Sequence, residues 1–204
     1  MPSTSVETAS PLATTLGTDP STPLERVLTA SLVLAPLMYL AADTTYAARG
    51  WSDPTAGVLH VLAAIAYGLV VLRVATWLPR NGVLLAAIVV TGLVGMAGNV
   101  AYGFETIHVS LGDIPLVDQP GAANLIKPLG LFFPLSFALV ALALWRLGHR
   151  WQGVLVLLAT IGWPVAHIGN IGAAAVPVNI ALVVAFGSLV WARGSGVSGN
   201  SANP

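Results

Sequence analysis

Four ionisable side chains stand inside or at the ends of long apolar stretches of this sequence: Asp43, His60, Glu105 and His167. An ionisable residue in hydrocarbon costs typically about 2.5–3.5 kcal/mol, so such residues usually face the interior of a helix bundle, where they are paired or hydrated. Imidazole binds iron and exchanges protons near neutral pH, and a carboxylate beside it can serve as an acid or a base. These four residues are therefore the first candidates for a functional site.

The elements that must position them are six apolar stretches, each close to the roughly 20 helical residues that cross a bilayer core. We expect the spans at 27–47, 56–77, 82–104, 128–146, 153–173 and 177–193. Charged residues make up 8% of the chain, against about 25% in soluble domains, and apolar residues make up 56%. The predicted fold class is therefore all-α, a multi-pass protein of the cell membrane with a bundle of six transmembrane helices.

The basic residues indicate how this bundle is oriented. With six spans, most of the Lys and Arg residues lie on the side that holds both chain ends: Arg26, Arg73, Arg80, Arg146, Arg150 and Arg193. Only Arg49 and Lys127 lie on the opposite side. Because cytoplasmic loops carry the excess of positive charge, we expect both chain ends in the cytoplasm.

Polar segments flank the six spans. Residues 1–24 are rich in Ser, Thr and Pro, and residues 194–204 are rich in Gly, Ser and Asn. Neither segment has apolar content to pack, so we predict two disordered cytoplasmic tails around a transmembrane domain over residues 25–193. The net charge is zero and no basic cluster is present, which argues against a nucleic-acid partner. The expected partner is the lipid bilayer, and other membrane subunits stay open as partners.

The predicted orientation brings three of the ionisable side chains to one depth. Asp43 lies about six residues before the outer end of the first span, His60 about five residues into the second, and His167 about five residues before the outer end of the fifth. At 1.5 Å per residue, all three lie roughly 8–9 Å below the outer boundary. We therefore predict one polar pocket in the outer half of the bundle, above a nearly pure Leu, Val, Ala and Ile inner half.

Helical spacing adds further polar residues to this pocket. Trp163, His167 and Asn170 follow the i, i+4, i+7 pattern of one helix face, and Tyr102 and Glu105 share a face of the third span. The predicted ligand- or cofactor-binding residues are Asp43, His60, Asn99, Tyr102, Glu105, His167 and Asn170. The alternative is a structural layer of interhelical hydrogen bonds, in which Lys127 pairs with Glu105.

Several kinds of chemistry are compatible with these residue types. His60 and His167 could be the axial ligands of a haem b held between two helices, because neutral imidazole is a standard iron ligand. No motif of a serine or zinc hydrolase is present, and Glu105-x-x-His108 supplies only half of one carboxylate–histidine arrangement for two irons. The connection over residues 105–127 could cover the pocket as a lid or lie on the outer surface as an amphipathic segment. No catalytic residue is predicted.

Four classes of function follow from this reading and stay open. The first is a protein that binds a small ligand or cofactor through the outer polar pocket. The second is a membrane enzyme acting on a lipid-soluble substrate, with a carboxylate and a histidine as acid and base. The third is a small-solute or proton transporter, which the apolar inner half disfavours. The fourth is an accessory subunit or assembly factor of a membrane complex, with no chemistry of its own.

Overall fold

The computed structural model describes residues 22–194, and the regular structure within that range is entirely helical, without a strand. The six long helices are α1 (Pro23–Arg49), α2 (Pro54–Ala75), α3 (Val83–Ser110), α4 (Ile126–Arg146), α5 (Arg150–Ile168) and α6 (Gly172–Gly194). Two short 3-10 helices, η1 (Leu116–Asp118) and η2 (Gly121–Leu125), lie between α3 and α4. Six helices are long and apolar enough to cross a membrane. The all-helical class with six long apolar helices is therefore confirmed.

The predicted tails fall almost entirely outside the described residues. The structure describes only the inner edges of the segments 1–24 and 194–204. Residues 22–24 belong to the start of α1, and Gly194 is the last residue of α6. The helical region thus begins slightly earlier in the chain than the predicted domain boundary.

Local sequence signals explain where the first two helices begin. Thr22 caps α1: its Oγ1 accepts from the Glu25 amide at 3.3 Å, and the Glu25 carboxylate accepts from the Thr22 amide at 3.2 Å. Asp53 caps α2 by accepting from the Ala56 amide at 2.9 Å, and Pro54 follows at the first helical position. These caps fix the chain entering α1 and the short α1–α2 connection, which carries Trp51.

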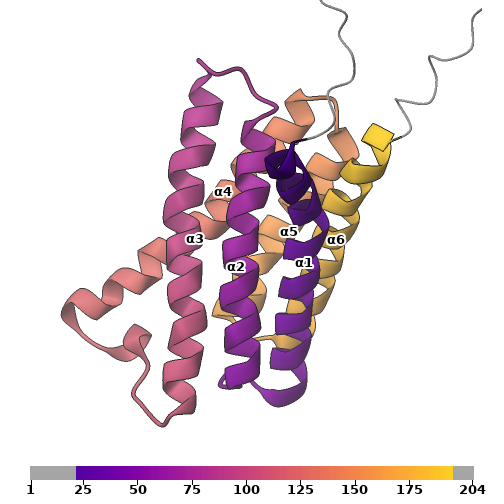
Figure 1. The fold of residues 1–204 in the computed structure, drawn as a ribbon. Coiled ribbons are helices and arrows are strands. Elements are labelled where there is room, and N and C mark those ends of the chain that lie inside the picture. Colours follow the sequence, from indigo (N-terminus) through magenta and orange to yellow (C-terminus); the bar gives the residue numbers. More distant parts are fainter. Residues whose placement is uncertain (1–21, 195–204) are drawn as a thin grey trace, which may run out of the picture.

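The six helices form a closed ring. Each long helix packs against its neighbours in the chain, and α1 also packs against α6. The start of α1 and the end of α6 lie at the same end of the bundle, with the α2–α3 and α4–α5 connections (Figure 1). The centre of the bundle is filled by large buried side chains, among them Tyr39, Tyr67, Phe133, Phe137 and Phe186. The α1–α2, α3–α4 and α5–α6 connections lie together at the opposite end.

Glycines allow a close helix contact between α3 and α4. A Cβ atom on Gly98 would lie 2.5 Å from the Leu129 carbonyl group, and one on Gly95 would lie 2.6 Å from the Phe133 amide nitrogen. Real Cβ atoms do not approach backbone atoms this closely. Small residues are the usual means by which two apolar helices bring their backbones together.

The turn between the last two helices differs from the predicted one. The predicted break lies at 174–176, before Pro177, whereas the chain turns at residues 169–171 and Pro177 belongs to α6. Asn170 has φ of 53°, a left-handed conformation that asparagine adopts more readily than most residues. The uninterrupted apolar sequence around the turn concealed it. The predicted placement of Asn170 on the same helix face as His167 is therefore wrong.

Candidate functional site

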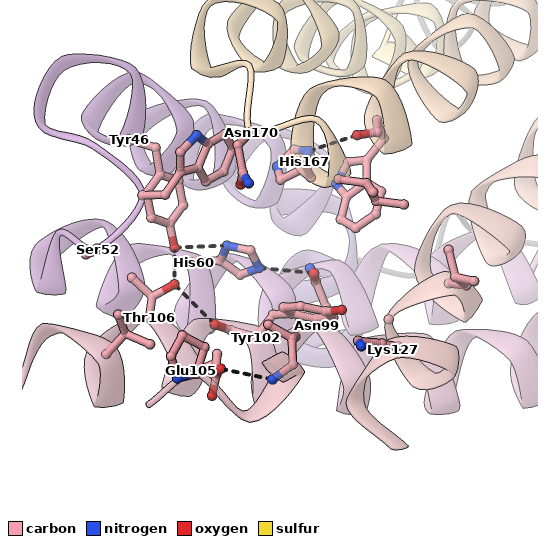
Figure 2. A pocket seen from close by; sticks show the side chains of 18 residues that line it. Tyr46, Ser52, His60, Asn99, Tyr102, Glu105, Thr106, Lys127, His167 and Asn170 are labelled. Atoms are coloured by element: carbon pink, nitrogen blue, oxygen red, sulfur yellow. Dashed lines mark hydrogen bonds between the residues drawn. The ribbon is translucent and has the colours of Figure 1, made fainter. Parts of the chain in front are cut away.

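A cavity of about 500 Å³ lies at the end of the bundle where the α1–α2, α3–α4 and α5–α6 connections meet (Figure 2). Each connection contributes to its wall. Trp51 and Ser52 come from the first, Pro115 and Val117 from the second, and Asn170 from the third. The cavity therefore occupies the end of the bundle at which the sequence placed the polar pocket.

Six of the seven residues chosen from the sequence line this cavity: His60, Asn99, Tyr102, Glu105, His167 and Asn170. The seventh, Asp43, is fully buried behind the wall and reaches the cavity only through its contact with His167. Asn170 contributes from the α5–α6 turn and is exposed. The structure thus brings the predicted residues together, with Asp43 supporting the wall from behind.

His60 is fixed by a hydrogen-bonded cluster that joins α1, α2 and α3. Its Nε2 lies 3.0 Å from Asn99 Oδ1 and 3.1 Å from the Tyr39 hydroxyl, and its Nδ1 lies 3.4 Å from the Tyr46 hydroxyl. The Tyr46 hydroxyl also lies 3.1 Å from Thr106 Oγ1. Both ring nitrogens are engaged in either tautomer, so the imidazole presents no free nitrogen to the cavity.

His167 is held by its own helix and by α1. Its Nδ1 lies 3.1 Å from the Trp163 carbonyl oxygen, and its Nε2 lies 3.3 Å from both carboxylate oxygens of Asp43. Asn179 on α6 donates from Nδ2 to Asp43 Oδ2. The imidazole stacks on the Trp163 ring, with centroids 4.4 Å apart and an angle of 14° between the planes. Three helices thus meet at one buried carboxylate.

Donor and acceptor counting shows how this pair carries its proton. A carbonyl oxygen only accepts, so His167 Nδ1 must carry a hydrogen and donate it to Trp163. The contact between His167 Nε2 and Asp43 then needs one more hydrogen, held either by the imidazole or by the carboxyl group. In both arrangements the pair is neutral as a whole, which is the condition for burying it without an unpaired charge.

Glu105 joins the cavity wall to the α3–α4 connection. It lies in the last turns of α3, which extends to Ser110, beyond the predicted end of this span. Its Oε1 accepts from the backbone amides of Leu116 and Val117, where η1 begins. Pro115 and Val117 line the cavity, so this part of the connection lies against it, as expected for the lid alternative.

The other oxygen of Glu105 has no partner. Glu105 is 7% exposed, and its Oε2 is buried without a hydrogen bond to any described residue. The suggested ion pair with Lys127 is absent, because no Lys127–Glu105 contact lies within 4.0 Å among the described ion pairs. Lys127 nevertheless lines the same cavity from the start of α4. The cavity wall therefore includes a carboxylate and an ammonium group that form no hydrogen bond or ion pair with each other.

Sequence reasoning missed one central residue of this site, Tyr39. Its ring centroid lies 4.8 Å from that of His60 and 6.0 Å from that of His167, so it is close to both imidazoles. A tyrosine within an apolar run carries no charge and gave no signal of depth. The spacing did carry a signal, because Tyr39, Asp43 and Tyr46 follow the i, i+4, i+7 pattern of one face of α1.

The haem reading does not fit these residues. Axial ligation by both histidines needs one free nitrogen on each ring and a planar slot between them. All four ring nitrogens are hydrogen-bonded to protein groups, and the Tyr39 ring is packed close to both imidazoles. Within the described residues no group of three or more His, Asp or Glu side chains is arranged to hold a metal ion. We derive no chemistry from an iron centre.

The two imidazoles are placed to hold the cavity wall together rather than to exchange protons with a ligand. A general base needs a nitrogen or oxygen within hydrogen-bond reach of the substrate, and both imidazoles use their nitrogens on protein partners. Among the charged groups of the wall, those of Glu105 and Lys127 do not pair with each other, and Trp163 Nε1 is also buried without a hydrogen bond. The rest of the wall is largely aromatic and apolar, including Tyr46, Trp51 and Tyr102. The chain matches no protein-family model, no curated protein and no solved structure.

Proposed function

We propose that this chain is an integral protein of the cell membrane that binds a small amphipathic molecule in the cavity at the outer end of its bundle. The observation that carries the proposal is the cavity itself. Its volume of about 500 Å³ lies within the roughly 300–1,000 Å³ of typical small-molecule sites. Its wall is mainly apolar and aromatic with a few convergent polar groups, which is the usual make-up of such sites.

Membrane insertion is supported by the outward faces of the helices. Large apolar side chains are exposed along every long helix, for example Leu34, Leu62, Leu93, Leu158 and Val184. An exposed apolar surface of this size is energetically unfavourable in water and favourable against lipid tails. The basic residues near the α2–α3 and α4–α5 connections support an orientation with these connections in the cytoplasm, and therefore the cavity outside.

Binding is favoured over transport by the core beneath the cavity. Below the level of His60 the bundle centre is packed with apolar and aromatic side chains, including Phe137, Val140, Leu144 and Phe186, all nearly inaccessible. A transport pathway would need polar lining or interrupted helices at that depth. The helices that contain Pro134 and Pro164 continue through these residues.

The proposal is tested by filling the cavity. Val109 lines it from α3, so Val109→Trp should displace a ligand, whereas Val58 is exposed on α2 and does not line it. The full chain and both variants would be purified in maltoside detergent, denatured and extracted, and the extracts compared by mass spectrometry. We expect a small molecule that is enriched with the wild type and Val58→Trp and is lost from Val109→Trp. Equal extracts from all three would overturn the binding function and favour an accessory subunit without a ligand.

A further inference from the structure

Building on the proposed ligand-binding function, we infer that the cavity takes a zwitterionic head group, with its ammonium end against Glu105 and its anionic end against Lys127. Two loop amides hold Glu105 Oε1, so the carboxylate cannot turn freely, and Oε2 of this cavity-lining residue is left buried without a partner. A buried carboxylate oxygen with no hydrogen bond is costly, and a donor on a ligand would remove that cost.

The charge balance of the cavity points to a ligand with both signs. Four side chains of its wall are acidic or basic: His60, Glu105, Lys127 and His167. His60 has only uncharged partners, and His167 forms a neutral pair with Asp43. One carboxylate and one ammonium group remain, and they do not pair with each other. A cation alone or an anion alone would satisfy one of them, whereas a zwitterion satisfies both.

Four further charged side chains at this end of the bundle are matched in two ion pairs. Arg49 Nη1 lies 3.8 Å from Asp53 Oδ2, and His108 Nδ1 lies 3.2 Å from Asp113 Oδ2. None of these four residues lines the cavity. They therefore do not compete for the head group.

The rest of the wall suits an ammonium group that is attached to an apolar chain. The aromatic side chains Tyr46, Trp51 and Tyr102 line the cavity, and aromatic faces attract cations, quaternary ammonium groups above all. The Tyr102 ring lies directly over Gly130 of α4, where a Cβ atom would be 2.3 Å from it. Leu131 and Ile168 line the cavity and are also 51% and 66% exposed, so its edge is continuous with the apolar outside of the bundle. An apolar tail can leave there.

The test uses the two tryptophans of the wall, Trp51 and Trp163, as fluorescent reporters in the full chain purified in maltoside detergent. The probes are phosphocholine, choline and glycerol 3-phosphate. We expect phosphocholine to bind about tenfold or more tightly than either half-charged probe, because only it engages both groups. Glu105→Gln keeps an acceptor for the loop amides and removes the charge, and Lys127→Gln removes the opposite charge. Each should weaken phosphocholine binding about tenfold, whereas Arg80→Gln, which removes an exposed charge at the opposite end of the bundle, should leave it unchanged.

Two sources could supply such a head group, a membrane lipid or a free solute. In nanodiscs of phosphatidylcholine, a lipid ligand would already fill the cavity, so added phosphocholine would no longer change the fluorescence. In nanodiscs of phosphatidylglycerol it would still do so. A free-solute site would respond in both membranes.

Equal affinity for the three probes, or unchanged phosphocholine affinity in Glu105→Gln and Lys127→Gln, would overturn the inference. Should Glu105→Gln fail to fold, Lys127→Gln decides. The ligand-binding function would survive this result if a molecule still co-purifies with the wild type and is lost from Val109→Trp. It falls only if that second experiment also fails.

Discussion

The hydroxyl group of Tyr39 on α1 contacts polar side chains of both α2 and α3. It lies 3.1 Å from His60 Nε2 and 3.2 Å from the Asn99 amide, and the tyrosine is almost fully buried. Tyr67 lies two turns below His60 on α2 and is equally buried, yet its hydroxyl has no hydrogen-bond partner among the described residues. The two tyrosines share size and burial, both rings lie beside Phe133, and their centroids are 5.7 Å apart.

This contrast predicts opposite outcomes for one chemical change. Tyr39→Phe should lower the free energy of unfolding by about 1–2 kcal/mol, because His60 and Asn99 lose a buried partner. Tyr67→Phe should be neutral or slightly stabilising, since no hydrogen bond is lost. Unfolding of both variants in mixed detergent micelles measures the difference. An equal loss in the two variants would mean that the Tyr39 hydrogen bonds contribute nothing.

Asp43 and His167 should behave as a unit. Asp43→Leu removes the carboxylate and leaves His167 Nε2 and Asn179 without their buried partner, which should cost about 3–5 kcal/mol. In the Asp43→Leu background, His167→Leu should lower the free energy of unfolding clearly less than it does in the wild type, because it removes an imidazole that already lacks its partner. The free energies of unfolding of the two single variants and the double variant give this coupling.

A cycle between Asp43 and Gln152 is the matched control. Gln152 is buried near the opposite end of the bundle, at the start of α5. Distant sites usually contribute additively, so this second cycle should show no coupling. Additive costs for Asp43 and His167 as well would refute the pairing.

At this scale the sequence predicted the ionisable residues of the site better than their neutral partners. Counting residues from the span ends is enough to place Asp43, His60 and His167 at one level, because a helix rises evenly along its axis. Counting does not tell which neutral side chain faces them. Tyr39 and Asn179, which complete the two clusters, needed the rotation of α1 and α6, and that rotation depends on packing.

The distance between α3 and α4 depends on glycines, which have no side chain. Gly98 lies against the Leu129 backbone, whereas a Cβ atom on Gly187 of α6 would meet nothing within 4 Å. The two glycines are both helical, so they form a matched pair for measuring close packing.

Gly98→Ala should therefore lower the free energy of unfolding by about 1–3 kcal/mol, because α3 and α4 must move apart. Gly187→Ala should be neutral or stabilising by up to about 1 kcal/mol, because alanine favours the helix. Thermal unfolding in the same detergent compares the two. A stable Gly98→Ala protein would show that the two helices separate at little cost.

Helix boundaries were the weaker part of the sequence prediction. The α1–α2 connection was found from its Gly50 and Pro54, and both residues stand at helix ends in the structure. The α5–α6 turn was misplaced because Pro177 looked like a break, although α6 continues through it. The chain turns instead at residues 169–171, where Asn170 has a left-handed backbone conformation. One asparagine is too weak a sequence signal to indicate a turn inside an apolar stretch.

For the whole molecule, the orientation in the membrane decides which solution the cavity meets. Reporter fusions at positions 20 and 196 should both report the cytoplasm if the excess of basic residues marks the inner side. The sequence has no cysteine, so single cysteines can add independent evidence. An impermeant maleimide should label Asp113→Cys in intact cells and Asn81→Cys only after lysis, because these exposed residues lie at opposite ends of the bundle. The reverse labelling pattern would place the cavity in the cytoplasm.

One carboxyl group, that of Glu105, belongs at once to the connection between α3 and α4 and to the cavity wall. The conformational order of that connection and the affinity of the cavity for its ligand are therefore thermodynamically linked. Linkage is reciprocal: if a ligand steadies the connection, anything that steadies the connection from outside raises the affinity by the same factor. An antibody fragment or a partner protein that binds residues 111–120 would change the affinity of the cavity without entering it. This segment would then control how much of the protein has a ligand bound.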